Sequence, residues 1–267
     1  MQETPDEWTP PTGVLGELIR SAAIRAAALT GDDAPAPRPV RRSLAEALRG
    51  DTVAIIAEIK RRSPSKGAIS PELNSDSQAR RYEEGGAAAI SVLTEPSRFG
   101  GELADIERVR SATSLPVLRK DFHVERAQLA EASALGASAA LLIVRALSPS
   151  LLGELAETGR DLGLEIVFEI RDERELDRAL RVGARIIGVN NRNLETLVID
   201  RDTVSRILPL IPRECIAIAE SGYSTRPDIE SAALAGADAV LIGSSLSAST
   251  DPAADVRELV GVPASTR

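Results

Sequence analysis

Lysine and glutamate side chains stand at the ends of several short apolar runs in this sequence. Glu58 and Lys60 end one run, Lys120 ends a second, and Glu169 lies near the end of a third. A charged side chain is costly to bury unless it is paired. An ammonium group can give a proton to a developing oxyanion, and a carboxylate can accept or return one. For any one residue a solvated loop entrance is about as good an interpretation, but the repeated pattern favours a shared acid–base site.

Strand geometry extends this set of candidate residues. Side chains at positions i and i+2 of a strand share one face, so if one member of such a pair lines a pocket, the other should line it too. The pairs are Glu58 with Lys60, Lys120 with Phe122, and Asn190 with Arg192. Glu220 lies near the end of a further apolar run and carries a carboxyl group, as Glu58 and Glu169 do.

Small residues follow the last two apolar runs. Ser221-Gly222 and Gly243-Ser244 would let backbone N–H groups approach an anion, and a following helix N-terminus would add a favourable dipole. Each pair alone is more often a simple turn. Two such pairs in successive terminal positions favour a phosphate site, and therefore a phosphorylated small-molecule substrate.

Apolar and basic residues are also expected near this site. Leu93, Phe99 and Phe122 are candidates for the wall around an aromatic or apolar ligand group, although packing of a loop explains them equally well. The segment 61–67, which carries arginine, serine and lysine, is either a solvated basic loop or a lid over an anionic substrate.

The composition excludes several classes of protein. The chain has 267 residues, Lys plus Arg 32 against Asp plus Glu 40, and a net charge of −8, so nucleic acid and anionic membranes are unsuitable partners. One cysteine, Cys215, and one histidine, His123, argue against a disulfide or a metal site. No apolar run approaches the ~20 residues of a membrane span. The N-terminus has no secretory pattern, so we expect a cytoplasmic protein.

Eight apolar runs are the predicted strands, and they begin 20 to 35 residues apart. Most are continuously apolar rather than alternating, which is typical of parallel strands buried on both faces. Amphipathic, helix-like stretches separate them, as a βα repeat requires. The predicted strands cover residues 53–60, 88–95, 115–122, 139–146, 165–170, 185–191, 215–221 and 239–246.

A glycine–alanine pair recurs before every second strand. Gly86, Gly136, Gly183 and Gly236 are separated by 50, 47 and 53 residues, and each is expected in the left-handed conformation after a helix. The repeating unit is thus two βα modules, four times over. This regularity favours a closed (βα)8 barrel over an open doubly wound sheet, and in such a barrel the functional residues gather at the C-terminal ends of the strands.

The remaining segments flank this barrel. We predict an N-terminal arm and helical extension over residues 1–50, a barrel catalytic domain over 51–250, and a C-terminal helix or tail of the same domain over 251–267. The extension should contain a helix over residues 14–29, a loop over 31–39, and a short helix capped by Ser43 with Glu46 as its capping-box partner. We interpret His123 as structural or surface-exposed and Cys215 as a small core residue.

Together these motifs resemble the indole-3-glycerol phosphate synthase family of tryptophan biosynthesis. The matching strings cover roughly residues 43–250 and are EIKRRSPSKG (58–67), LRKDF (118–122), ALLIV (140–144), FEIRDE (168–173), IGVNNRNLETL (187–197), AESG (219–222) and LIGSSL (241–246). The resemblance implies an α/β fold, a (βα)8 TIM barrel with an N-terminal helical extension. It also implies conversion of 1-(2-carboxyphenylamino)-1-deoxyribulose 5-phosphate to indole-3-glycerol phosphate, CO2 and water, with no cofactor and no metal.

The resemblance also implies a role for each candidate. Lys120 corresponds to the general acid, Glu169 to the partner carboxylate for dehydration, Glu58 to a second essential carboxylate, and Lys60 to a lysine at the anionic substrate groups. By the same resemblance, the substrate carboxylate and sugar hydroxyls are contacted by Ser63, Asn190 and Arg192, and Glu220 belongs to the AESG string. The implied phosphate cradle consists of Ser221, Gly222, Gly243 and Ser244. The implied wall around the anthranilate ring consists of Leu93, Phe99, Phe122, Leu141 and Leu241.

Two rival functions are weighed against this one. A sister barrel such as phosphoribosylanthranilate isomerase uses a Cys or Asp at the end of the first strand, where this chain has Glu58 and Lys60. A non-catalytic phosphate-ligand sensor would have no need of a paired acid and base. The proline-rich loop over 31–39 and His123, at a position that is usually aliphatic, depart from the family pattern. We expect a monomer, with a weak homo-oligomer as the alternative.

Overall fold

Eight parallel strands close into a barrel in the computed structural model, which describes residues 8–29 and 42–265. The strands are hydrogen-bonded in the order β1-β10-β9-β8-β7-β6-β5-β4, with β4 returning to β1. Their bounds are β1 (Ala54–Ile59), β4 (Ala89–Leu93), β5 (Val117–Lys120), β6 (Ala139–Ile143), β7 (Glu165–Ile170), β8 (Ile186–Asn190), β9 (Ile216–Glu220) and β10 (Ala239–Ile242). The closed barrel predicted from the sequence is confirmed, and the open sheet is excluded.

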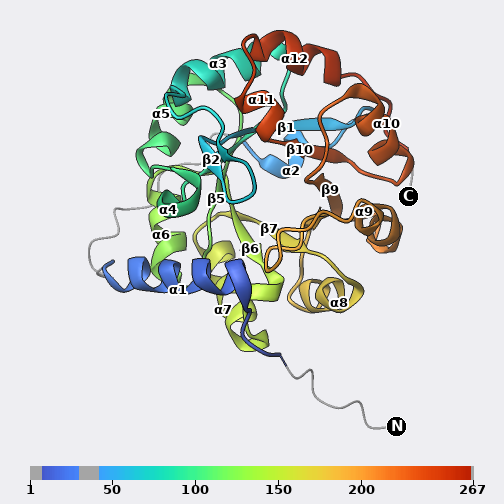
Figure 1. Ribbon diagram of the computed structural model, residues 1–267. Helices are drawn as coiled ribbons and strands as arrows, with labels where there is room; N and C mark the ends of the chain where they lie inside the picture. Colours follow the sequence, from blue (N-terminus) through green and yellow to red (C-terminus); the bar gives the residue numbers. More distant parts are fainter. Residues whose placement is uncertain (1–7, 30–41, 266–267) are drawn as a thin grey trace.

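Helices surround this barrel as a ring in Figure 1. They are α3 (Ser75–Gly85), α4 (Pro96–Phe99), α5 (Ala104–Ala112), α6 (Arg126–Ala134), α7 (Pro149–Asp161), α8 (Glu173–Arg181), α9 (Asp202–Ile207), α10 (Arg226–Leu234), α11 (Ser244–Ser247) and α12 (Pro252–Leu259). Two 3-10 turns, η1 (Val144–Ala146) and η2 (Leu208–Leu210), follow β6 and α9. Each predicted strand run contains one observed strand; several runs extend further because their last residues form the loops of the barrel mouth.

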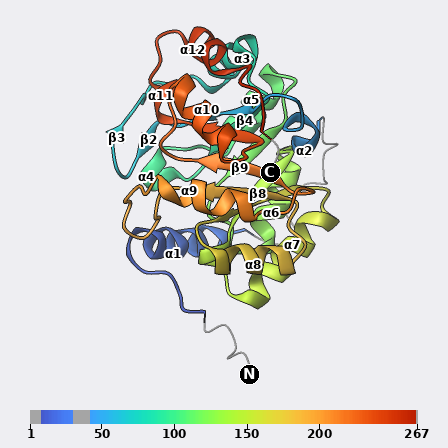
Figure 2. The same ribbon diagram turned by 90° about the vertical axis from the view of Figure 1, so that its right-hand side faces the viewer.

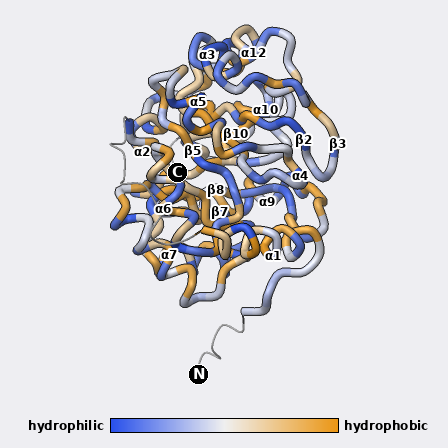
Figure 3. The backbone as a smooth tube through the Cα atoms, turned by 90° about the vertical axis from the view of Figure 1, so that its left-hand side faces the viewer, coloured by the Kyte–Doolittle hydropathy of each residue, from blue (hydrophilic) through white to orange (hydrophobic). Residues whose placement is uncertain are grey.

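The core is aliphatic and lies on both faces of the strands. Nearly every strand residue is buried, as the continuous apolar runs predict. In the hydropathy colouring of Figure 3, β7, β8 and β10 are largely orange, whereas the outer helices mix blue and orange. Each helix therefore contributes one apolar face to the core, while the strands contribute two.

The four repeated glycines follow α3, α6, α8 and α10. Gly86, Gly136, Gly183 and Gly236 have φ angles of 96°, 81°, 81° and 94°. This left-handed conformation is the one predicted from the repeat, and a side chain would be strained in it. The glycine repeat thus marks the point where every second helix turns back toward the barrel.

The N-terminal extension contributes α1 (Gly13–Ala27) and α2 (Leu44–Ala47). Figure 2 places α1, α4 and the small hairpin of β2 (Arg62–Ser63) with β3 (Gly67–Ala68) on the same side of the barrel. Ser43 caps α2 as predicted, by accepting a hydrogen bond from the Glu46 N–H. The Ser43 hydroxyl also donates to Glu165 of β7, so the cap attaches the extension to the barrel. The predicted loop over 31–39 and the first seven residues lie outside the described residues.

Candidate active site

A cavity of about 360 Å³ opens at the C-terminal ends of the strands. All of the predicted site residues except Glu169 line it. They are Glu58, Lys60, Ser63, Leu93, Phe99, Lys120, Phe122, Leu141, Asn190, Arg192, Glu220, Ser221, Gly222, Leu241, Gly243 and Ser244. These residues come from seven strands or the loops that follow them, so the barrel collects in one place side chains that are distant in the sequence.

Lys120 is the centre of the charged part of the cavity. Its Nζ donates to Glu169 Oε2 at 3.2 Å and lies 3.7 Å from Glu220 Oε2. Glu169 and Glu220 are both buried, and Lys120 has only 16% of its side chain exposed. The second lysine, Lys60, donates from Nζ to Glu58 Oε1 at 2.5 Å. The site therefore holds two ammonium groups among three buried carboxyl groups.

The pKa values of both Lys120 and Glu220 are raised in this buried, closely packed group of charges. Burial opposes the charge on Lys120, but Glu169, Glu220 and Glu58 together outweigh it and raise the pKa of Lys120 above its ordinary value. Burial, with the charges of Glu169 and Glu58, raises the pKa of Glu220 to about 8 against the opposing effect of Lys120. Lys120 is thus a charged donor at neutral pH, and the carboxyl group of Glu220 keeps its proton to a higher pH than an ordinary glutamate does.

One glycine is required by the close approach of these charges. A Cβ on Gly243 would lie 2.1 Å from Glu58 Oε1 and 2.7 Å from Lys60 Nζ. Any side chain at this position would displace the ion pair between Glu58 and Lys60. The glycine after β10 therefore serves the acid–base group as well as the loop predicted to bind phosphate.

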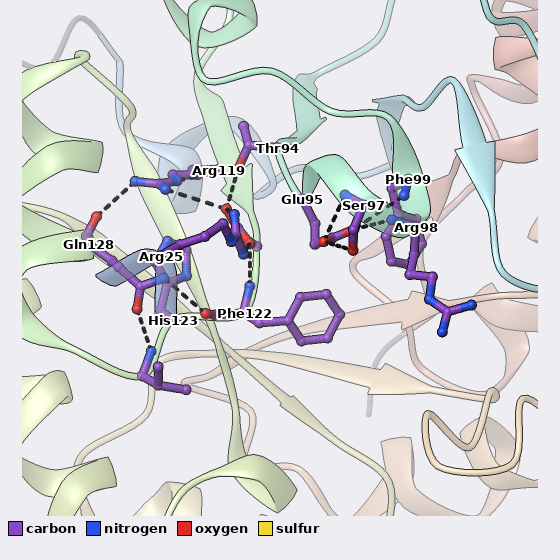
Figure 4. Close-up of polar contacts among 12 residues, drawn as sticks. Arg25, Thr94, Glu95, Ser97, Arg98, Phe99, Arg119, Phe122, His123 and Gln128 are labelled. Carbon is purple, nitrogen blue, oxygen red and sulfur yellow. Dashed lines mark hydrogen bonds and ion pairs between the residues drawn. The ribbon is translucent and has the colours of Figure 1, made fainter. Parts of the chain in front are cut away.

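Two phenylalanines form the apolar wall of the cavity. The Phe99 and Phe122 ring centroids are 6.2 Å apart, with the ring planes tilted by 34°. Each of the two residues donates its backbone N–H to a buried carboxylate: Phe99 to Glu95 at 3.2 Å and Phe122 to Asp121 at 2.8 Å (Figure 4). The backbone that carries the two rings is thus held at the short helix α4 and at the end of β5.

Asp121 also borders the larger cavity and was not among the predicted site residues. It accepts hydrogen bonds from Thr94 at 2.7 Å and from Arg25 of α1 at 2.9 Å. Burial opposes its charge, but Arg119 and the hydrogen bond from Arg25 hold the pKa of Asp121 well below its usual range. The carboxylate between two cavity residues thus attaches the N-terminal helix to the strand that carries Lys120.

The loop after β9 contains two of the residues predicted to form an anion cradle, Ser221 and Gly222. Ser221 and Gly222 have positive φ angles of 66° and 93°. Asn191, which is buried, donates from Nδ2 to the Ser221 carbonyl at 3.0 Å. The loop after β10 lies on the same cavity and adds Gly243, Ser244 and Ser245. Small residues from two successive loops thus face one region, as anion binding by backbone N–H groups requires.

The loop after β8 closes another side of the cavity. The Arg192 N–H donates to Asn190 Oδ1 at 2.9 Å, and its guanidinium donates to the Leu197 carbonyl at 2.9 Å. Leu194, Leu197 and Ile199 of this loop line the cavity and were not predicted. They could have been predicted from the string LETLVI (194–199), because it places apolar residues in the loop that follows a predicted strand.

The segment after β1 folds as the β2–β3 hairpin at the cavity mouth. Ser63, Pro64, Ser65 and Lys66 line the cavity, and the Ser63 hydroxyl accepts from the Lys66 N–H at 3.2 Å. Arg61 is turned away and pairs with the buried carboxylate of Asp105. In the segment 61–67, residues 63–66 thus line the cavity, whereas Arg61 forms an ion pair away from it.

Glu169 faces a second, smaller cavity of about 190 Å³. This cavity shares Ile143, Asn190, Arg192 and Leu194 with the larger one. Glu169 therefore borders the smaller cavity and contacts Lys120, which lines the larger one.

Neither His123 nor Cys215 belongs to the cavity. His123 is 2% exposed, and its Nδ1 lies 2.8 Å from the Leu141 carbonyl oxygen. Burial and Arg119 lower the pKa of His123 to about 4, so it is neutral near pH 7 and donates from Nδ1 to that carbonyl. Cys215 is buried immediately before β9. Both residues therefore have the structural surroundings expected for them, with His123 buried rather than on the surface.

Neither a metal site nor a membrane-spanning helix is found within residues 8–29 and 42–265. No group of three or more His, Cys, Asp or Glu side chains within these ranges could hold a metal ion. Across the same ranges, no helix has both the length and the apolar character that a membrane crossing would need.

The fold and the cavity define a class of protein: a (βα)8 barrel whose mouth holds two lysines among three buried carboxyl groups, beside two loops of small residues. Solved structures of similar fold include 3-hexulose-6-phosphate synthase from Salmonella typhimurium, with a TM-score of 0.63, 14% identity, and coverage of 78% of this chain and 96% of that chain. Thiamine phosphate pyrophosphorylase from Pyrococcus furiosus has a TM-score of 0.59, 17% identity, and coverage of 78% and 93%. At these identities the likeness concerns the fold alone.

Sequence comparison identifies the family. The family model for indole-3-glycerol phosphate synthase matches residues 21–259. The indole-3-glycerol phosphate synthase of Streptomyces griseus is 50% identical over 218 residues, covering 82% of this chain and 81% of the relative. That of Mycolicibacterium vanbaalenii is 48% identical over 258 residues, covering 92% and 93%. The chain belongs to the indole-3-glycerol phosphate synthase family, and is therefore a carboxy-lyase of tryptophan biosynthesis that acts on a phosphorylated small molecule.

Proposed function

We propose that the larger cavity performs ring closure, decarboxylation and dehydration of 1-(2-carboxyphenylamino)-1-deoxyribulose 5-phosphate, with Lys120 as the general acid. The observation that carries this proposal is the position of the Lys120 ammonium, 3.2 Å from Glu169 and 3.7 Å from Glu220, in a cavity also lined by the small residues that we expect to bind the phosphate. An ammonium held in place by carboxylates is a fixed donor for an oxyanion that forms beside it.

The first step forms the carbon–carbon bond of the new ring. The ring carbon that bears the carboxylate attacks the ketone carbon of the sugar chain, and the carbonyl electron pair moves to oxygen. Lys120 gives its proton to this oxygen, so the product of the step is a hydroxyl group rather than an oxyanion. Phe99 and Phe122 provide the apolar wall against which the aromatic ring is held.

The second and third steps remove CO2 and water. Loss of CO2 returns its bonding electron pair to the ring. The new hydroxyl then leaves as water once it is protonated, and the neighbouring carbon, which is bonded to the nitrogen, loses a proton as the double bond of the indole forms. Glu169 is the partner carboxyl for this dehydration, and Glu220, whose pKa is raised to about 8, is the protonated carboxyl that stands next to it. One member of this pair can thus give a proton while the other receives one.

The phosphate group and the carboxylate fix the two ends of the substrate. Ser221, Gly222, Gly243 and Ser244 are assigned to the phosphate, which is far enough from the reacting carbons to provide binding without chemistry. Ser63, Asn190 and Arg192 are assigned to the carboxylate and hydroxyl groups, and Lys60 to an anionic group of the substrate. Glu58, paired with Lys60, orients the hydroxyls or assists proton transfer.

The cellular setting is a further part of the proposal. Because the chain belongs to a family of biosynthetic enzymes, we infer that it works in the cytoplasm, and we expect it to be a monomer. Sedimentation velocity at micromolar concentration tests the oligomeric state, with a single species of 28.3 kDa as the expected result.

An indole-fluorescence assay separates this function from its rivals. The purified protein is incubated with the carboxyphenylamino-deoxyribulose phosphate in the presence of a chelator, and indole fluorescence and released CO2 are followed together. The proposal predicts equal amounts of both products. An isomerase would instead consume phosphoribosylanthranilate, and a sensor would bind the substrate without releasing CO2.

A further inference from the structure

Two residues other than glycine have left-handed backbones within residues 8–29 and 42–265, and both line the larger cavity. They are Leu197, with φ 65°, and Ser221, with φ 66°. A side chain in this conformation is strained, so the surrounding contacts must hold it. An arginine guanidinium donates to a carbonyl at each place: Arg192 to Leu197 and Arg201 to Gly222, the residue after Ser221.

We propose that Arg201 is a positioning residue for the phosphate cradle, holding the Ser221-Gly222 turn in the shape that receives the phosphate. The proposal rests on the proposed function, since it assigns the turn to the substrate's phosphate. Arg201 was not predicted from the sequence and lies at the start of α9, on the loop after β8 rather than on the cradle itself.

The contacts of the turn support this role. Arg201 Nη2 donates to the Gly222 carbonyl at 2.8 Å, and Asn191 Nδ2 donates to the Ser221 carbonyl at 3.0 Å. Two consecutive carbonyls are therefore fixed by side chains of the preceding loop. With these carbonyls engaged, the N–H groups of the turn remain for an anion, which is how successive backbone N–H groups form an anion site.

The charge of Arg201 also lies on the cavity. Its side chain lines the wall next to Ser221, Gly222 and Tyr223. Arg201 pairs with Asp228 at 3.2 Å, but that carboxylate also accepts the Ser224 and Thr225 N–H groups, which with other contacts keep the pKa of Asp228 below its usual range. Arg201 thus links the loop after β8 to Gly222 of the proposed cradle and to Asp228 near the start of α10. It also places a positive charge beside the proposed phosphate position.

The exposure of Arg201 separates this role from a purely structural one. Its side chain is 68% exposed, and an exposed ion pair contributes little to stability. The contact with Gly222 should therefore matter for substrate binding and hardly at all for folding. A substitution at this position should change KM and leave the unfolding transition where it is.

The test is Arg201→Gln, which removes the charge and the forked donor but keeps a polar side chain. We expect KM for the phosphorylated substrate to rise about tenfold, and kcat to change by less than about threefold, because one charge-assisted contact near a bound phosphate is lost. The inhibition constant of inorganic phosphate should rise with KM. Arg201→Lys, which retains the charge and one donor, should restore part of the affinity.

Arg206→Gln is the matched control. Arg206 stands on the same helix, is 48% exposed and pairs with Glu173, and it is not part of the cavity wall. We expect this variant to keep KM and the phosphate inhibition constant of the wild type, with unfolding midpoints alike in all four proteins. An unchanged KM in Arg201→Gln, or an equal rise in Arg206→Gln, would overturn the inference. Absence of indole product from the wild type would instead contradict the proposed function.

Discussion

At the scale of single residues, the site depends on charges that fix one another. Lys120 is surrounded by carboxyl groups of three strands, and their combined effect keeps it protonated in spite of burial. Glu220 has the opposite character: burial and the nearby carboxylates keep its proton up to about pH 8. Under the proposed function, Lys120 is the cationic donor for ring closure, and Glu220 is a second donor for dehydration.

Replacement of Lys120 by methionine tests the general-acid role. Lys120→Met keeps most of the side-chain length without the ammonium, so the barrel should fold while ring closure loses its proton donor. We expect kcat to fall on the order of 10²–10⁴-fold. Stopped-flow indole fluorescence measures this rate, and circular dichroism checks the fold. Near-normal turnover would remove Lys120 from the acid role.

The pH dependence of activity tests the protonated form of Glu220. Its pKa is raised to about 8, so the group is protonated below that pH and ionised above it. If the protonated form is the active one, kcat/KM should fall as pH rises through about 8. The measurement is a profile of kcat/KM from pH 6 to about 10, spanning the range between the pKa values of ordinary carboxyl and amino groups.

Glu220→Gln is the control for this profile. Glutamine has no proton to lose in this range, so the fall above pH 8 should be absent, although overall activity is lower. The same fall in the variant would assign it to another group, and a flat wild-type profile would show that Glu220 does not titrate where we expect.

At the scale of elements, the N-terminal helix α1 is attached to the strand that carries the acid. Arg25 of α1 donates to Asp121, and Asp121 in turn accepts the N–H of Phe122. The Thr94 hydroxyl and Arg119 contact the same carboxylate. The helix that precedes the barrel in the chain thus contributes to the position of the cavity wall, and Leu18 of α1 lines the cavity directly.

Arg25→Met tests this attachment. Asp121 would lose a bidentate partner but keep Arg119, Thr94 and the Phe122 N–H, so we expect the free energy of unfolding to fall by about 1–2 kcal/mol near pH 7. The pKa of Asp121 is lowered in the folded protein, so its contribution is present at neutral pH and is lost as pH falls through that low value. The difference between variant and wild type should therefore shrink in strong acid. Urea denaturation at several pH values measures both effects.

Glu17→Gln provides the comparison on the same helix. Glu17 pairs with Arg98 of α4, and both side chains are more than half exposed. Because such pairs contribute little, we expect a change of less than about 0.5 kcal/mol. Equal losses in Glu17→Gln and Arg25→Met would mean that the Asp121 contact has no special part in holding α1.

At the scale of the whole molecule, the barrel could be predicted from the sequence because its strands are buried on both faces. Burial of this kind gives continuous apolar runs, and the glycines at 86, 136, 183 and 236 mark the returns between them. Charges at the ends of these runs then indicated the cavity. The strand alternation also placed Lys120 with Phe122, and Asn190 with Arg192, on the same wall.

The supporting contacts could not be predicted in this way. Asp121 meets Arg25 across 96 positions of sequence, and Asn191 meets the Ser221 carbonyl across 30. Arg201 contacts a loop that follows the next strand. Each of these partners is determined by the tertiary arrangement of neighbouring βα loops, and local patterns of hydrophobicity carry no information about it. The small second cavity beside Glu169 is a product of the same packing.

A crystal structure with indole-3-glycerol phosphate bound is the most direct test of the account. We expect the phosphate against the loops of Ser221-Gly222 and Gly243-Ser244, the indole ring against Phe99 and Phe122, and Lys120 facing the pyrrole side of the ring. A phosphate bound elsewhere, or an indole ring out of reach of Lys120, would contradict the claim that one cavity both anchors the substrate and closes its ring.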